Sequence, residues 1–159
     1  MKPITRLPIP VMKALRFATL IALGTLAFTA FAAGMVDLRR GTVELPGGFT
    51  HTRDKGKDST VGHFTSADGS LTIHYDIGKM AGVQAKATDL KDIVSSESVK
   101  AGDLDALIVV HGAKPRKIVI SFPGGGPANF FAEVRGDEDI AMVRKLVLTF
   151  KLKPLEPGK

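Results

Sequence analysis

A β-hairpin pattern between Val61 and Ile77 constrains the fold of this chain more than any other feature. Two segments that alternate apolar and polar residues, 61–65 and 70–77, flank the turn Ser66-Ala67-Asp68-Gly69. An Asp-Gly pair tolerates the positive φ angles of a tight turn, so the pattern predicts two antiparallel strands. If Ala67 and Asp68 are the central turn residues, Phe64 lies opposite Leu71 on the core face. The opposite, mostly polar face then carries Val61, His63, Thr65, Thr72, His74 and Asp76.

Two dense apolar runs, 106–110 and 118–122, predict two further strands. Neither run alternates with polar residues, so we expect central strands covered on both faces, joined by a turn at 112–116. A short edge strand is predicted at 42–45 and another strand at 130–135.

Two helices are also expected. One is indicated by Leu90, Ile93, Val94 and Glu97, which are spaced for one helical face, with Thr88 or Asp89 as its N-cap. The other begins at the acidic residues 137–139, which suit the positive end of the helix dipole. Its apolar face consists of Ile140, Val143, Val147 and Phe150, although 146–150 could instead start a last strand.

These elements predict an α+β fold, an antiparallel β-sheet of about six strands with two helices packed on it. The expected domain covers residues 42–152. Residues 33–41 form a lead-in, 50–60 a polar loop and 153–159 a disordered tail.

The N-terminal segment predicts export. Lys13 and Arg16 precede an uncharged apolar stretch that begins at Phe17 and ends in Ala30-Phe31-Ala32, a small-x-small cleavage site before Ala33. This order of basic, apolar and small residues is typical of a secretory signal peptide, here residues 1–32. Met12 could be the true start. An uncleaved membrane anchor over 17–36 is the alternative, because that run approaches the ~20 residues that span a bilayer.

Cleavage changes the charge of the chain. The formal net charge is +6, from 22 basic and 16 acidic residues. The signal segment holds four basic residues and no acidic one, so 18 basic residues remain and the net charge falls to +2. Nucleic acid is therefore not an expected partner, and the membrane is reached only through the signal sequence.

Few residues in the sequence indicate chemistry. The chain has no cysteine, which excludes disulfides, thiolate metal sites and a lipidated N-terminal Cys. Gly124-Gly125-Gly126 lacks the Lys-Ser/Thr pair of a phosphate-binding loop and predicts a turn. No Gly-x-Ser-x-Gly nucleophile motif occurs, so we predict no catalytic residue and no cofactor. His51 lies in the predicted loop and His111 ends a predicted strand, so neither indicates a base.

His63, His74 and Asp76 are the candidate metal ligands. They share the polar hairpin face, with the two histidines as diagonal neighbours across the strands. Two imidazoles and one carboxylate could hold an open metal site. The competing interpretation is an ordinary polar sheet face.

Phe130 and Phe131 are the candidate contact surface. They are adjacent on a predicted strand, so one ring faces each side of the sheet. A ring that no helix covers would become an exposed anchor for a partner.

The order of elements resembles a known family. The segment VELPGGFTHTRD, the strand–turn–strand after it, and FFAEVR leading through GDEDIAMVRKLVLTF are similar to the PsbP-like superfamily over residues 42–152. The resemblance implies an α+β fold and a non-enzymatic accessory or binding role, with no functional residue carried over.

The sequence therefore predicts a periplasmic or secreted, non-enzymatic accessory or binding domain for an envelope protein or a small ligand. The alternatives are a small metal-dependent hydrolase that uses His63, His74 and Asp76, and an inner-membrane protein with an uncleaved N-terminal helix.

Overall fold

The computed structural model describes residues 33–78, 81–86, 92–112, 114–124 and 127–153. The elements in these ranges are β1 (Gly34–Asp37), β2 (Gly41–Leu45), β3 (Phe49–Arg53), β4 (Thr60–Ser66), β5 (Thr72–Ile77), the 3-10 helix η1 (Gln84–Lys86), β6 (Ile93–Ala101), β7 (Leu104–His111), β8 (Arg116–Phe122), β9 (Ala128–Val134), α1 (Asp137–Val147) and β10 (Lys151–Leu152). The strands form two antiparallel sheets, a seven-stranded sheet of order β3-β4-β5-β9-β8-β7-β6 and a three-stranded sheet of order β1-β2-β10.

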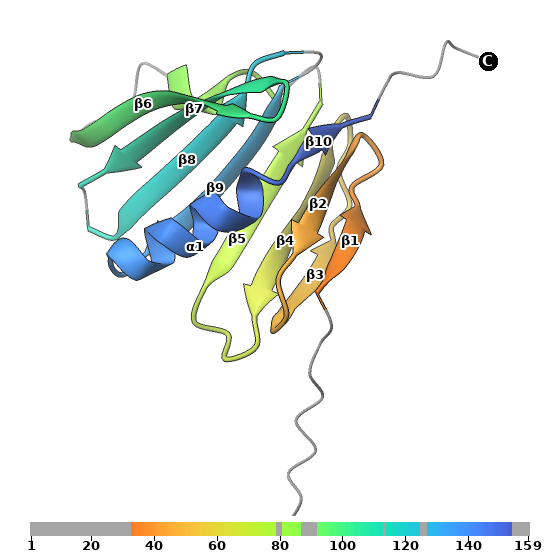
Figure 1. The fold of residues 1–159 in the computed structure, drawn as a ribbon, viewed down its shortest axis with the longest axis horizontal. Coiled ribbons are helices and arrows are strands. Elements are labelled where there is room, and N and C mark those ends of the chain that lie inside the picture. Colours follow the sequence, from red (N-terminus) through yellow and green to blue (C-terminus); the bar gives the residue numbers. More distant parts are fainter. Residues whose placement is uncertain (1–32, 79–80, 87–91, 113, 125–126, 154–159) are drawn as a thin grey trace, which may run out of the picture.

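Helix α1 and the three-stranded sheet cover the same face of the seven-stranded sheet (Figure 1). Between these layers lies one core of side chains that spans the chain from Leu38 to Phe150. At its centre Phe122, Phe130 and Phe150 are in mutual contact, with ring centroids 5.0–6.0 Å apart. Helix α1 contributes Val143, Leu146 and Val147 to this core. The opposite face of the seven-stranded sheet has no second layer of strands over it among the described residues.

The predicted fold class is wrong. The structure is mostly β, with two sheets and, in the part of the chain it describes, a single α-helix instead of two helices on about six strands. The second helix is missing because 93–101 forms the edge strand β6, paired with β7 along its length. This segment is rich in poor helix formers, namely Ile93, Val94, Val99 and several serines, and its β-branched side chains favour a strand. Leu90, Thr88 and Asp89 lie outside the described residues.

Three smaller expectations near the N-terminus are also wrong. The lead-in at 33–41 contains β1, and β2 is the central strand of the small sheet, between β1 and β10, not an edge strand. The predicted loop at 50–60 begins with β3, which pairs with β4. Strands β1 and β3 each pair with the next strand along the chain, and β2 gains a second partner from the distant β10; these pairings supply backbone hydrogen bonds that local sequence does not show.

The hairpin is confirmed, but its register differs from the prediction by two residues. Phe64 lies opposite Ile73, and His63 lies opposite His74. The Asp68 carboxylate accepts hydrogen bonds from the Ser66 hydroxyl and from the Ser70 hydroxyl and N–H, which holds a wider turn. A shift by two residues keeps every side chain on its predicted face. The strands at 106–110 and 118–122 and the helix from Asp137 are confirmed as well. The expected cover on both faces of these strands is not: on the face away from α1 the described residues cover them only locally, where Ala85 of η1 packs on Val109 and Val119.

Candidate functional site

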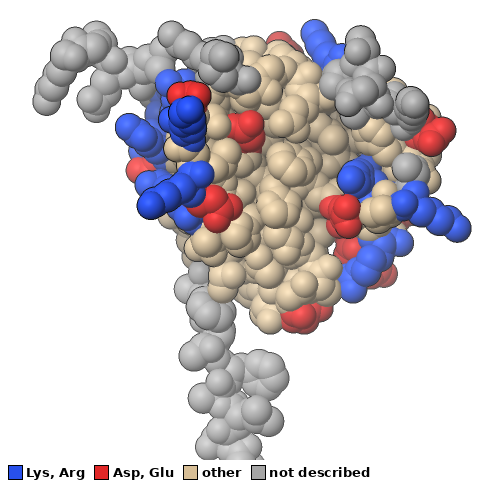
Figure 2. Space-filling model, turned by 180° about the vertical axis from the view of Figure 1, so that it is seen from behind, with Lys and Arg blue, Asp and Glu red and all other residues tan. Residues whose placement is uncertain are grey.

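A groove of about 460 Å³ crosses the open face of the seven-stranded sheet, the face that α1 does not cover. Figure 2 shows this face as a largely uncharged area with charged side chains toward its edges. Strands β5, β8 and β9 form the floor. The lining consists of Ser70, Thr72, His74, Gln84, Lys117, Val119, Phe131, Ala132 and Glu133.

Two stacked rings form the middle of the groove. His74 and Phe131 lie opposite each other on β5 and β9, with ring centroids 5.5 Å apart and planes at 17°. Their position follows from the period of two in a strand, because Tyr75 and Phe130, the next residues on each strand, point into the core. Phe131 is half-buried and also packs on Val119 beneath η1. The pair gives the middle of the groove an aromatic lining.

One wall of the groove is fixed by a buried polar network. The Asn129 side chain accepts hydrogen bonds from the Gln84 N–H (3.0 Å) and the Ser121 hydroxyl (2.6 Å), and its amide donates to the Gly82 carbonyl oxygen (3.0 Å). The Ser121 hydroxyl accepts the Ala85 N–H at 3.0 Å. Ser121 and Asn129 are completely buried, so these bonds form away from water and hold η1 against the sheet.

The sequence reasoning did not identify Ser121 or Asn129. The signal was present, since each is a polar residue inside an otherwise apolar strand, and buried polar groups require partners. Those partners lie in the segment 81–86. The alternation of residues within the strands does not show where this segment packs against the sheet.

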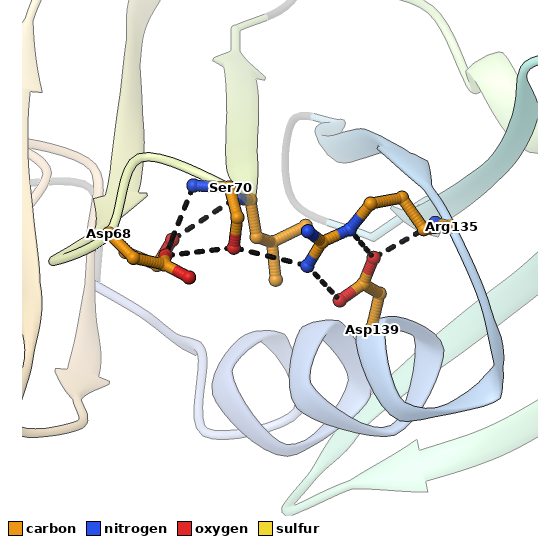
Figure 3. Close-up of polar contacts among 6 residues, drawn as sticks. Asp68, Ser70, Arg135 and Asp139 are labelled. Atoms are coloured by element: carbon orange, nitrogen blue, oxygen red, sulfur yellow. Dashed lines mark hydrogen bonds and ion pairs between the residues drawn. The ribbon is translucent and has the colours of Figure 1, made fainter.

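Charged groups stand along the rim of the groove. Lys117 and Glu133 form an exposed ion pair across β8 and β9, with 3.5 Å between Nζ and Oε1. At another end Ser70 is held by Asp68 and by the guanidinium of Arg135, which in turn is bound to Asp139 in the first turn of α1 (Figure 3). Hydrogen bonds from Ser66 and Ser70 lower the pKa of Asp68 to about 2. The β4–β5 turn is thereby tied to the helix.

The three predicted metal ligands lie on the predicted face, but they do not converge. His63 and His74 are direct cross-strand neighbours with ring centroids 5.7 Å apart, not diagonal ones. His63 Nδ1 is 3.0 Å from Asp54 Oδ2, while one carboxylate oxygen of Asp76 is buried without a hydrogen-bond partner. Among the described residues no group of three His, Asp or Glu side chains is arranged to hold a metal ion.

Phe130 and Phe131 face opposite sides of the sheet as expected, Phe130 in the core and Phe131 in the groove.

His51 lies on β3, not in a loop, and its Nε2 is 2.9 Å from the Tyr75 hydroxyl. Burial there lowers the pKa of His51 and raises that of Tyr75. His111 is a buried strand end. Gly125, Gly126, the cleavage site Ala30-Ala32 and the signal segment 1–32 lie outside the described residues, whereas Ala33 is exposed.

Comparisons with known proteins do not assign this chain to a family. No protein-family description, no curated protein and no solved structure matches this chain. Within the described ranges, no helix has the length and apolar character needed to span a bilayer.

Proposed function

We propose that this chain is an exported, non-enzymatic binding module that holds a small ligand in the groove of β5, β8 and β9. The observation that carries the proposal is the stacked pair of His74 and Phe131 at the centre of that groove. Aromatic side chains together with a few polar groups are a common lining of small-ligand pockets. A volume of about 460 Å³ falls within the range of small-molecule sites.

The lining indicates the kind of ligand. The floor is apolar and aromatic, whereas the rim offers the hydroxyl of Thr72, the amide of Gln84 and the opposite charges of Lys117 and Glu133. Exposed ion pairs contribute little to stability, so Lys117 and Glu133 can turn toward a bound molecule. The arrangement fits a molecule with one flat ring and a polar edge.

A fluorescence titration with 1-anilinonaphthalene-8-sulfonate tests the groove, because this probe has aromatic rings and one anionic edge. We expect Phe131→Thr to weaken probe binding by about tenfold, the loss of roughly one aromatic contact. The matched control is Met142→Thr, which changes an exposed apolar residue on α1, behind the sheet. Equal binding by wild type and Phe131→Thr, with both folded, would reject the groove as the ligand site.

The export part of the proposal rests on the basic, apolar and small-residue order of segment 1–32. Mass spectrometry of protein recovered from its native host tests it. We expect a mature chain that begins near Ala33. A mass that retains residues 17–32 would instead support the membrane-anchored alternative.

A further inference from the structure

A second pocket, of about 310 Å³, lies away from the groove, where the β1–β2 turn meets the loop before β4. Its lining is almost entirely polar and consists of Arg39, Arg40, Gly56, Lys57, Asp58, Ser59 and Thr60. Figure 2 shows Lys and Arg side chains, with some Asp and Glu among them, along the edge of the molecule that holds β1 and β3, and a second mixed group at the opposite edge.

The turn that carries the two arginines is held by several hydrogen bonds. Arg39 has a φ of 68°, a left-handed conformation that a glycine or asparagine adopts at lower cost than arginine. The Arg39 N–H donates to the Asp37 carboxylate at 2.6 Å, and the other oxygen of Asp37 accepts a bond from Lys153 Nζ. The Lys153 N–H donates to the Arg40 carbonyl oxygen. Hydrogen bonds from Lys153, far along the chain, thus help to hold Arg39 in a backbone conformation that is unfavourable for arginine.

The opposite side of the pocket is equally constrained. Gly56 has no room for a side chain, because an added Cβ would overlap the Ser59 carbonyl oxygen. Gly78, at the end of β5, would bring a Cβ to 3.0 Å from that of Ser59. The two glycines let the loop fold tightly, and this fold turns Lys57, Ser59 and Thr60 toward the arginines.

Among the described residues, no side chain is paired with the three cations of this pocket. Every other arginine that the structure describes is bonded to a carboxylate or a carbonyl oxygen, namely Arg53, Arg116, Arg135 and Arg144. Arg39, Arg40 and Lys57 form no ion pair or side-chain hydrogen bond with a described residue, and Asp58 is the one acidic residue in the lining. Three unpaired positive charges around one polar hollow favour an anion.

We propose that this pocket binds a phosphate group. The planar guanidinium groups of Arg39 and Arg40 can each bind two phosphate oxygens, Lys57 adds a third cation, and the hydroxyls of Ser59 and Thr60 can donate to the remaining oxygens. The lack of apolar lining means that only the anionic group itself enters the pocket. A free phosphate compound and the phosphate of a lipid headgroup share this chemistry.

Isothermal titration of the full chain with inorganic pyrophosphate tests for a free phosphate compound. Flotation with phosphatidylcholine vesicles that contain phosphatidylglycerol tests for a lipid headgroup. In at least one arm we expect binding that Arg39→Gln/Arg40→Gln weakens by about tenfold or more, since two charge-assisted contacts are lost. The matched control, Lys114→Gln/Lys145→Gln, removes the same charge from exposed positions elsewhere and should bind like wild type.

Thermal unfolding shows whether each variant is folded. If Arg39→Gln/Arg40→Gln does not fold, Lys57→Gln takes its place, because Lys57 lies on the loop and has no part in the turn. The arm in which binding depends on the arginines identifies the source of the phosphate. The proposal is overturned if neither probe binds, if the arginine variant binds like wild type, or if the control loses as much affinity, which would indicate attraction by net charge alone.

Discussion

His74 stacks on Phe131 across the β5–β9 pair, and directly beside it His63 faces His74 from β4. This row of rings lies on the one face of the seven-stranded sheet that neither α1 nor the small sheet covers. On this face the row of rings lies between the wall held by Ser121 and Asn129 and the exposed ion pair of Lys117 and Glu133.

The buried network behind the groove wall should be important for stability. Ser121→Ala should lower the free energy of unfolding by about 1–3 kcal/mol, because it leaves the Ala85 N–H without a partner and removes one of the two hydrogen bonds to the Asn129 oxygen. Urea unfolding measures the change. Ser98→Ala, on the exposed edge strand β6, is the control and should have almost no effect. Faster amide exchange at Gln84 and Ala85 in Ser121→Ala would show that the wall has loosened, and unchanged exchange would contradict its proposed anchoring.

Adjacent phenylalanines should differ sharply in their effect on stability. Phe130→Ala should cost about 3–5 kcal/mol, because this ring is fully buried against Phe122 and Phe150. Phe131→Ala, one residue further, should cost much less, since its ring is only half-buried in the groove. Chemical unfolding of the two variants side by side gives the comparison. Equal losses would mean that Phe131 serves the core instead of a ligand.

His51 should make stability depend on pH below neutrality. Burial, with Arg53 and His63 nearby, lowers the pKa of His51 below its usual value of about 6.5, so the folded protein binds its proton less readily than the unfolded chain. The stabilising contribution is therefore complete above about pH 6.5 and is lost as the pH falls through the lowered pKa. Between pH 7.5 and pH 5, the unfolding free energy of His51→Gln should fall by less than that of the wild type, because the variant lacks the histidine whose proton uptake on unfolding causes part of the loss. Parallel pH profiles for the two proteins would contradict the prediction.

Replacement of Gly62 in β4 by a larger residue should destabilise the protein. An added methyl group would overlap the Tyr75 hydroxyl and the Thr52 carbonyl oxygen, so Gly62→Ala should destabilise the protein by about 1–3 kcal/mol. Gly124→Ala is the control, because nothing lies within 4 Å of its added Cβ and its φ is not positive. Thermal unfolding should separate the two variants. A Gly62→Ala protein as stable as wild type would mean that Tyr75 can move without cost, together with its bond to His51.

Much of the local structure could be predicted because it depends on neighbouring residues. The alternation in 61–77 identified both strands of the hairpin and the face of each side chain, and the same period of two placed Phe130 and Phe131 on opposite sides of their strand. The dense apolar runs of β7 and β8 and the acidic first turn of α1 could also be predicted from the sequence. The register of the hairpin could not be predicted, because hydrogen bonds of Asp68 widen the turn.

The alternating segments, the apolar runs and the turns can be recognised in the amino-acid sequence, since strand and helix periods are properties of consecutive residues. The three-dimensional fold was needed to establish that 93–101 is a strand, that β1 and β10 flank β2, and that Ser121 and Asn129 anchor a wall of the groove. It alone brought Arg39 and Arg40 to the loop of Lys57. The physical reason is that backbone pairing and buried polar contacts join residues that are distant along the chain, and one side of such a contact does not reveal the other.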